Sequence, residues 1–394
     1  MATPRTIHIP GRKVSQGTYS AFVPNPLPPE LDWSPRLIGV LSDADRLIGR
    51  LAGEGGRLPN PHILMRPFVR REAVLSSMIE GTQATLGELL AAEAGAAVDR
   101  PEDLREVGNY VIALEHGVAR LKKLPLCVRL TRELHEKLMT GVRGQQAAPG
   151  VFRKTQNWIG RPGSTLATAS YIPPPPGEVE PCLAAWEKFL HESDLPPLVT
   201  IALAHYQFEA IHPFLDGNGR VGRLLITLFL IERQILPTPL LYLSAFFEAS
   251  RRDYYDSLRG ISEHGAWNDW LEYFLLGVAR MSEDALSRAT RINQLLSQWQ
   301  KRVSGESTNN PLRVVELLGA NPFITTTGAA TKLGVAFTTA QRAIERLEQA
   351  GILNRVGKAK RGRVSCARAL LDILEEPAQL KPVPKKPVLL RDKT

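Results

Sequence analysis

His212-Pro-Phe-Leu-Asp-Gly-Asn-Gly-Arg-Val-Gly-Arg223 is the stretch of this 394-residue chain that carries most of its chemical information. It combines an imidazole, a carboxylate, three glycines, an amide and two arginines, and apolar runs flank it on both sides. Gly217 and Gly219 let the backbone approach a ligand closely, and the free N–H groups at a helix start bind anions. The stretch therefore predicts an active site for a metal-complexed polyphosphate.

Individual side chains of this stretch have separate roles in that prediction. Arg220 and Arg223 lie three positions apart, on one face of the following helix, where they can clamp neighbouring phosphates. Asp216 suits Mg²⁺, which takes one or two carboxylates together with phosphate oxygens. His212 can accept the proton of an attacking hydroxyl. The other residues expected to line the nucleotide site are Asn218, Val221 and Gly222.

Other phosphate and metal motifs fit this sequence less well. Residues 217–222 satisfy the pattern G-x-G-x-x-G, but a dinucleotide fold needs a strand before the glycines and an acid about 20 residues later. Here a long apolar run with helical character, 198–211, precedes the glycines, and position 242 is a tyrosine. The sequence has no Walker-type Gly-Lys-Ser/Thr, no HExxH and no Cys/His cluster for zinc. We therefore reject the dinucleotide and zinc interpretations.

The twelve-residue motif resembles, at every fixed position, the signature of the Fic family of AMP-transferring enzymes, and the resemblance runs from about residue 19 to residue 276. It implies that His212 is the general base, that Asp216 binds Mg²⁺, and that Asn218 with the glycine nest holds the α-phosphate of ATP. It also implies that Arg220 binds the α- and β-phosphates and Arg223 the γ-phosphate. The implied reaction transfers AMP from ATP to a Ser, Thr or Tyr hydroxyl of a target protein.

A second resemblance lies upstream, in Ser76-Ser-Met-Ile-Glu80-Gly81. This stretch is similar to the inhibitory motif Ser/Thr-x-x-x-Glu-Gly/Asn of the same family. Ser76 and Glu80 are four positions apart, so they share one helix face. The resemblance implies that Glu80 pairs with Arg223 and blocks productive placement of the γ-phosphate, as in the class with an N-terminal inhibitory helix. Taken alone, the pattern would also fit an ordinary exposed helix end.

Two further regions are similar to the family. Residues 157–176 resemble its flap hairpin, whose edge would pair with an extended segment of the target protein. Tyr254 and Tyr255 resemble a tyrosine pair that abuts the adenine, although ordinary aromatic core is the alternative for both. His205, two helical turns before His212, is expected to be a packed core histidine.

The chain as a whole is predicted to be mainly α, with the Fic helical fold, a β-hairpin flap and a small winged helix-turn-helix domain. Periodic apolar residues predict helices through most of the first 300 residues, while residues 1–35 are Pro-rich and expected to be irregular. The predicted divisions are an N-terminal helical region with the inhibitory helix (1–100), the catalytic core (101–300), a linker (301–310), the winged helix-turn-helix (311–376) and a basic disordered tail (377–394).

The excess positive charge lies entirely in the last quarter of the chain. Residues 301–394 hold 17 Lys/Arg against 8 Asp/Glu, whereas residues 1–300 hold 32 of each. Three helical patterns followed by two strands resemble a winged helix-turn-helix, for which DNA is the expected partner. A protein-interaction module and a solubilising basic tail are the alternatives. The DNA-contact candidates are Arg342 and Arg346 on the third helix, with Gln341, and Lys358, Lys360, Arg361 and Arg363 on the wing.

That third helix is predicted to begin with a capping box of Thr338 and Gln341 and to end at Gly351.

The surroundings of the protein are also predicted from composition. Three scattered cysteines, no signal-peptide pattern and no apolar run of about 18 residues indicate a soluble, cytoplasmic protein with no membrane contact. A rival to the transferase is a DNA-binding transcription regulator whose Fic core only senses nucleotide. A third option keeps the enzyme but transfers another phosphate-containing group, or removes AMP. The sequence leaves a homodimer open.

Overall fold

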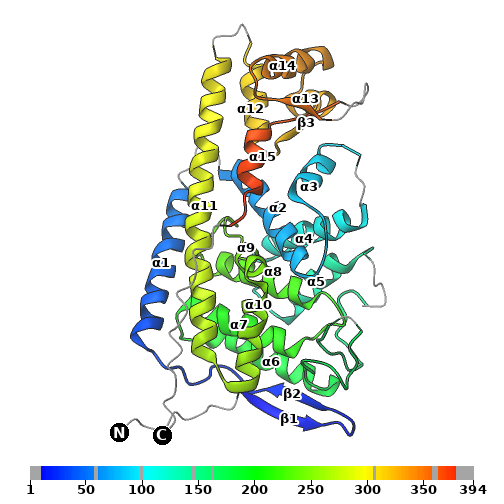
Figure 1. Ribbon diagram of the computed structural model, residues 1–394, viewed down its shortest axis with the longest axis vertical. Coiled ribbons are helices and arrows are strands. Elements are labelled where there is room, and N and C mark those ends of the chain that lie inside the picture. Colours follow the sequence, from blue (N-terminus) through cyan, green and yellow to red (C-terminus); the bar gives the residue numbers. More distant parts are fainter. Residues whose placement is uncertain are drawn as a thin grey trace, which may run out of the picture.

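The structure, a computed structural model, describes residues 10–56, 61–97, 101–142, 148–161, 163–304, 308–356 and 363–378. Helices make up most of these residues, and the strands form two small antiparallel sheets. The mainly helical prediction is therefore confirmed (Figure 1).

The chain opens with a β-hairpin, in which β1 (Gly11–Ser15) pairs with β2 (Ser20–Pro24). Five helices follow: α1 (Pro35–Gly56), α2 (Pro61–Ile79), α3 (Leu86–Glu93), α4 (Pro101–Arg120) and α5 (Val128–Met139). The next six are α6 (Pro176–Glu192), α7 (Pro197–Ile211), α8 (Asn218–Glu232), α9 (Ser244–Ala249), α10 (Arg251–His264) and α11 (Trp267–Val303). The long α11 runs the height of the molecule, and α1 packs along it (Figure 1).

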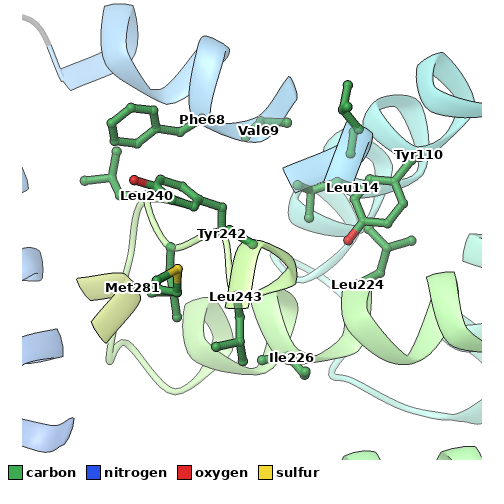
Figure 2. Close-up of a cluster of buried hydrophobic side chains, with 14 of the residues drawn as sticks. Phe68, Val69, Tyr110, Leu114, Leu224, Ile226, Leu240, Tyr242, Leu243 and Met281 are labelled. Atoms are coloured by element: carbon green, nitrogen blue, oxygen red, sulfur yellow. The ribbon is translucent and has the colours of Figure 1, made fainter. Parts of the chain in front are cut away.

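Helices α7 and α8 form the centre of the core and carry the catalytic motif between them. Both are apolar on almost every side, which is typical of a helix surrounded by protein. Proline at Pro197 starts α7 because its fixed φ suits the first helical position, where no N–H is needed. Figure 2 shows the cluster that covers α8, with Tyr110 of α4 beside Leu224. This packing holds the ends of α7 and α8, and hence the motif, in fixed positions.

The C-terminal unit combines short helices with a three-stranded sheet. Its elements in chain order are α12 (Asn310–Ala320), β3 (Phe323–Thr325), α13 (Thr326–Leu333), α14 (Phe337–Gln349), β4 (Asn354–Val356) and β5 (Val364–Cys366). The antiparallel sheet has the order β3-β5-β4, so Cys366 pairs with both Phe323 and Asn354. A final helix, α15 (Arg368–Glu375), leaves this unit and packs against α2 and α11 (Figure 1).

Several sequence-based boundaries are corrected by the structure. The β1–β2 hairpin lies where irregular chain was expected; Phe22 of β2 donates its N–H to the Ile172 carbonyl, a partner 150 residues away. The capping box at Thr338 is wrong, because the N-cap of α14 is Ala336, two residues earlier, and Gln341 donates to Glu345 instead. The linker begins later than predicted, because α11 continues to Val303.

The prediction of a hairpin flap is met only in part. Among its described residues, the flap (157–176) has a single antiparallel bridge, between Ile159 and Tyr171, rather than a regular hairpin. The predicted end of α14 is confirmed, because the helix stops at Gln349 and Gly351 has a φ of 68°. Residues 379–394, most of the predicted basic tail, lie outside the described residues.

Candidate active site

His212 stands at the exact junction where α7 ends. Its backbone is left-handed, with a φ of 48°, a conformation that usually falls to glycine or asparagine after a helix. Pro213 follows and has no N–H with which to continue the helix. The chain therefore turns sharply at His212 and enters the motif loop.

The imidazole of His212 is set up to accept a proton. Its Nδ1 lies 3.3 Å from the backbone carbonyl of Glu209, so this nitrogen carries the hydrogen and Nε2 keeps a free lone pair. The pKa of His212 is lowered to about 4: burial lowers it most and the Arg153 cation also lowers it, against the opposing effects of the Glu209 hydrogen bond, Glu80 and Asp216. The ring is therefore neutral at pH 7, as a general base requires.

The loop after His212 leads into the N-terminus of α8, which is suited to binding an anion. Gly217 precedes the helix with a φ of 77°, and a Cβ there would come within 2.9 Å of Met139 Sδ. The first N–H groups of a helix have no intrahelical partner, so those of Asn218 and Gly219 are available to an anion. Asp216 lies at the rim, with its side chain 58% exposed and one carboxylate oxygen on the Gly217 N–H.

The side chain of Asn218 builds the loop itself. Its amide oxygen accepts from the Phe214 N–H at 2.8 Å, and its amide nitrogen donates to the Phe214 carbonyl at 2.9 Å. Asn218 is also buried. Contact with a phosphate thus falls to its backbone N–H, while the carboxamide keeps the loop closed.

Arg223 lies under the inhibitory motif predicted from the sequence. Its Nε donates to Ser76 Oγ at 2.8 Å, and its Nη2 donates both to the Ser76 carbonyl and to Glu80 Oε1, the latter at 2.6 Å. Burial alone would raise the pKa of Glu80, but the Arg223 guanidinium outweighs burial and the pKa lies below its ordinary value. Ser76 and Glu80 therefore contact the same arginine; the family resemblance implied this pairing for Glu80. Gly81, with a φ of 101°, ends this turn.

Glu80 also fills space at the start of α8. A Cβ on Gly219 would collide with Glu80 Oε1 and would lie 2.9 Å from Arg223 Nη1. The carboxylate thus stands beside the very N–H groups that would receive a phosphate. The Glu80–Arg223 ion pair thus fills the space beside Gly219.

Arg220 is buried with an incomplete set of partners. Its Nη1 lies 3.4 Å from Glu106 and its Nη2 3.6 Å from Met139 Sδ, while Asp216 is 3.9 Å away. Its Nε is buried and has no hydrogen-bond partner among the described residues. A buried donor without a partner carries a free-energy cost, which an anionic ligand would relieve. Val221 and Gly222 face the protein interior rather than the loop.

The two tyrosines predicted beside the adenine differ in their surroundings. Tyr254 is buried, its hydroxyl lies 2.8 Å from His205 Nε2 and its ring stacks on Phe247 at 4.4 Å. Tyr255 is 42% exposed and its ring lies 5.2 Å from that of Tyr254. Tyr254 and His205 are therefore core residues, and Tyr255 alone presents an open ring face.

The structure brings in residues that the sequence patterns missed. His135 of α5 stacks on Phe214 at 3.7 Å; its Nε2 donates to the Asp216 carbonyl, and its Nδ1 accepts the Gly150 N–H. Arg153 and Asn157 both donate to the His212 carbonyl. These residues lie 55 to 81 positions from their partners in the motif, so no local spacing could have identified them.

Glu209, three residues before His212, is a further missed group. Its Oε1 is buried without a hydrogen-bond partner among the described residues, and burial raises its pKa to about 7. A Cβ at Gly222 would lie 2.5 Å from this oxygen. The glycine at this variable position of the motif therefore makes room for the carboxyl group.

The DNA-contact candidates are only partly described. Arg342 and Arg363 are exposed, and Arg346 is half-buried on α14. Lys358, Lys360 and Arg361 lie outside the described residues.

Neither a membrane span nor a metal cluster is found within the described residues. None of the helices there combines the length and apolar character that crossing a membrane takes. Nor do three or more His, Cys, Asp or Glu side chains gather there in a group that could hold a metal ion.

Comparison with known proteins identifies the family. Residues 38–119 match the Fic/DOC family N-terminal domain, and residues 125–230 match the Fic/DOC family domain. Protein adenylyltransferase Fic of Drosophila erecta is 33% identical over 161 residues, which cover 39% of this chain and 30% of that relative. The Drosophila melanogaster protein of the same name is 32% identical over 161 residues, which cover 39% of this chain and 30% of that relative. The chain thus spans about a third of the length of the curated relatives that it matches.

A solved structure agrees in fold. The crystal structure of a Fic family protein from Desulfovibrio desulfuricans covers 86% of this chain and 98% of its own, with a TM-score of 0.58 at 21% identity. This likeness shows the Fic helical fold. Residues 38–119 and 125–230 are thus the two domains of the Fic/DOC family, and the chain has the Fic helical fold.

Proposed function

We propose that this protein is a protein adenylyltransferase, which transfers AMP from ATP to a Ser, Thr or Tyr hydroxyl of a target protein. The observation that carries the proposal is the neutral His212 next to the start of α8, where open N–H groups and two buried arginines converge. The relatives named protein adenylyltransferase Fic support it over the part of the chain that they match.

The proposed chemistry uses His212 as the base. Its Nε2 takes the proton of the target hydroxyl while the hydroxyl oxygen bonds to the α-phosphorus of ATP. The bond from the α-phosphorus to the oxygen bridging to the β-phosphate breaks, and pyrophosphate leaves with that electron pair. The N–H groups of Asn218 and Gly219 stabilise charge on the α-phosphate, and Arg220 binds the α- and β-phosphates. Tyr255 is the proposed contact for the adenine.

Asp216 fits the proposed Mg²⁺ ion. Its carboxylate is largely exposed at the rim of the nest, and the described residues offer no cluster that would bind a metal by protein ligands alone. Mg²⁺ commonly takes one or two carboxylates and completes its shell with phosphate oxygens and water. When bound, the ion neutralises charge on the phosphates.

Glu80 is proposed to inhibit the enzyme through Arg223. While the 2.6 Å ion pair persists, the guanidinium cannot receive a γ-phosphate, and the carboxylate occupies the space beside Gly219. Removing the carboxylate frees both the cation and the volume.

We also propose where the target docks and where the protein is located. The flap edge near Ile159 and Tyr171 offers backbone groups that an extended target segment could pair with. The three cysteines are buried free thiols, which supports a reducing, cytoplasmic location. A homodimer stays a prediction.

For residues 311–376 we propose a winged helix-turn-helix that binds DNA. The support is the order of three helices and a three-stranded sheet, together with the exposed Arg342 on α14 and Arg363 next to β5. A gel-shift titration with mixed-sequence duplex DNA tests this, with the double substitution Arg342→Ala/Arg363→Ala expected to weaken binding. Unchanged affinity in that variant would point away from this surface.

The deciding experiment incubates three proteins with α-labelled ATP, Mg²⁺ and lysate. We expect little label with wild type, strong label on protein with Glu80→Gly, and none with Glu80→Gly/His212→Ala. No label from Glu80→Gly, on itself or on lysate proteins, would contradict adenylyl transfer. DNA binding retained in that case would favour the nucleotide-sensing regulator; label transferred from a different phosphate-containing donor would favour an altered group transfer.

A further inference from the structure

We infer that Arg153 is the positioning residue that holds the catalytic turn at His212 and the end of the flap in one fixed relation. The inference rests on the proposed function, because it concerns how the base and the target-docking edge are aligned. It names a residue outside both the catalytic motif and the inhibitory motif.

The contacts of Arg153 are almost all with backbone carbonyls. Its Nε donates to the His212 carbonyl at 2.9 Å, and its Nη2 donates to the carbonyls of Ile211, at 3.3 Å, and Pro174. Its own backbone N–H donates to the Pro213 carbonyl at 2.9 Å. The residue is 3% exposed and forms no ion pair among the described residues. One buried guanidinium thus joins the end of α7 to the end of the flap.

The charge of Arg153 suits this place. The last carbonyls of a helix have no N–H partner within the helix, and they form its negative pole. The Ile211 and His212 carbonyls are such groups at the end of α7. A cation that donates to both satisfies them and offsets the negative pole, so it needs no acidic partner.

The turn at His212 needs external support. A left-handed backbone at a residue with a side chain is unfavourable, and it persists where the surrounding contacts impose it. Besides Arg153, only Asn157 among the described residues donates a side-chain N–H to the His212 carbonyl, at 3.3 Å, and it also donates to the Phe214 carbonyl. The hydrogen bond from Arg153 to the His212 carbonyl is the shorter of the two, at 2.9 Å. Of these two side chains, only Arg153 also donates to the Pro174 carbonyl.

The flap shares this anchor. Pro174 follows the bridge between Ile159 and Tyr171, and the Tyr171 hydroxyl donates to the Ala210 carbonyl on α7. Among the described residues, Arg153 forms no hydrogen bond or ion pair with residues 217–223. Its loss should therefore misplace the base relative to the docked target while leaving the phosphate-binding residues as they are.

The electrostatics agree with this geometry. The Arg153 cation is one of the causes that lower the pKa of His212. Burial lowers the pKa of Arg153 itself to about 10, so the guanidinium is still charged at neutral pH. Replacing it with a neutral side chain should raise the pKa of His212.

The test compares Arg153→Met, Arg153→Lys and a matched control in the Glu80→Gly background. The control is Arg233→Met, because Arg233 also caps a helix end, donating to the Leu190 carbonyl of α6 away from the site. At saturating ATP, we expect Arg153→Met to label protein about a hundredfold more slowly, as misplacement near 1 Å can cost that factor. The dissociation constant for ATP should change less than about twofold, which a collapse of the whole site would not allow.

Arg153→Lys separates charge from geometry. It keeps the cation near His212 but has no planar fork to bridge the His212 and Pro174 carbonyls. We expect the pH midpoint of labelling by Arg153→Lys to stay near that of the Glu80→Gly parent, and its labelling rate to stay low. The inference would be overturned if Arg153→Met labelled protein as fast as its Glu80→Gly parent. It would also be overturned if the labelling rate and the affinity for ATP fell by the same factor.

Two measurements do not depend on activity. In the otherwise wild-type chain, an NMR titration of His212, assigned with His212→Ala, should show a higher pKa in Arg153→Met. Hydrogen exchange should show faster exchange of flap amides near Ile159 and Tyr171. An unchanged pKa together with unchanged exchange would refute the positioning role even if no label transfer is ever seen. If instead Glu80→Gly shows no transfer but both changes occur, the proposed function fails and the positioning role stands.

Discussion

The imidazole of His212 owes its basic form to its surroundings. The Glu209 carbonyl takes the Nδ1 hydrogen, which leaves Nε2 to accept a proton. Burial disfavours the imidazolium, and Arg153 opposes a second positive charge. A free histidine would be partly protonated near neutral pH, and a protonated ring cannot act as a base. The protein thus keeps the base available at pH values where an exposed histidine would lose it.

This environment predicts the pH dependence of transfer. The pKa of His212 is about 4, below the ordinary 6.5, so the base is lost only as the pH falls through about 4. Because Glu80 raises this pKa, label incorporation by Glu80→Gly should stay near its pH 7 value at pH 6 and about 5, with a midpoint at or below about 4. Initial rates across buffers of constant ionic strength measure the midpoint. A midpoint close to 6.5 would contradict the depressed pKa.

At the scale of elements, the packing of α11 against α9 depends on a glycine. Gly277 lies in the middle of α11, where a Cβ would come within 2.6 Å of the Phe246 ring of α9. An aromatic ring packed in the core cannot turn away as a flexible chain end can. Gly49 of α1 is exposed and has open space at its Cβ position.

These two glycines give opposite predictions for the same substitution. Gly277→Ala should lower the free energy of unfolding by about 1–3 kcal/mol, because overpacking outweighs the better helix propensity of alanine. Gly49→Ala should raise it by about 0.5–1 kcal/mol, because only propensity changes. Urea denaturation followed by circular dichroism measures both. Stabilisation by Gly277→Ala would show that α9 yields at this contact.

Elements were predicted unevenly from sequence. The apolar runs of α7 and α8 and the position of the motif between them were clear, because both signals lie within single continuous segments. The β1–β2 hairpin was missed because residues 1–35 are Pro-rich, which favoured irregular chain, although the two strands are neighbours in sequence. The capping box at Thr338 was a local sequence pattern, but the N-cap of the helix is Ala336, two positions earlier.

At the scale of the whole molecule, the C-terminal unit and α15 both contact α2. Arg71 of α2 donates to the carbonyls of Leu374 and Glu376 at the end of α15. Arg288 of α11 donates to the carbonyls of Ile373 and Pro377. These two guanidinium groups cap α15, and the Gly87 N–H of α3 donates to Glu375 at 2.9 Å. The unit and α15 thus pack on α2, the helix that ends directly before Glu80 (Figure 1).

This arrangement predicts that loosening the contact raises basal transfer. Arg71→Met removes two hydrogen bonds between α2 and α15, so α2 should hold Glu80 on Arg223 less firmly, and wild-type labelling from α-labelled ATP should rise severalfold. Arg302→Met is the control, because Arg302 joins α11 to the Ala350 carbonyl without touching α2. Faster hydrogen exchange in α2 should accompany the rise. If labelling is unchanged while the amides of α15 exchange hydrogen faster, the contact between α2 and α15 has only a structural role.

What the sequence by itself determined is local. Residue types and spacings within one segment revealed the twelve-residue motif, the helical class and the shared face of Ser76 and Glu80, because a helix places neighbours at known offsets. The tertiary structure decided the rest. It placed Glu80 on Arg223 across 143 positions, put His135 behind the Asp216 carbonyl, and set Arg153 between the base and the flap. Those contacts depend on how helices pack, and packing depends on the whole core at once rather than on any one stretch of chain.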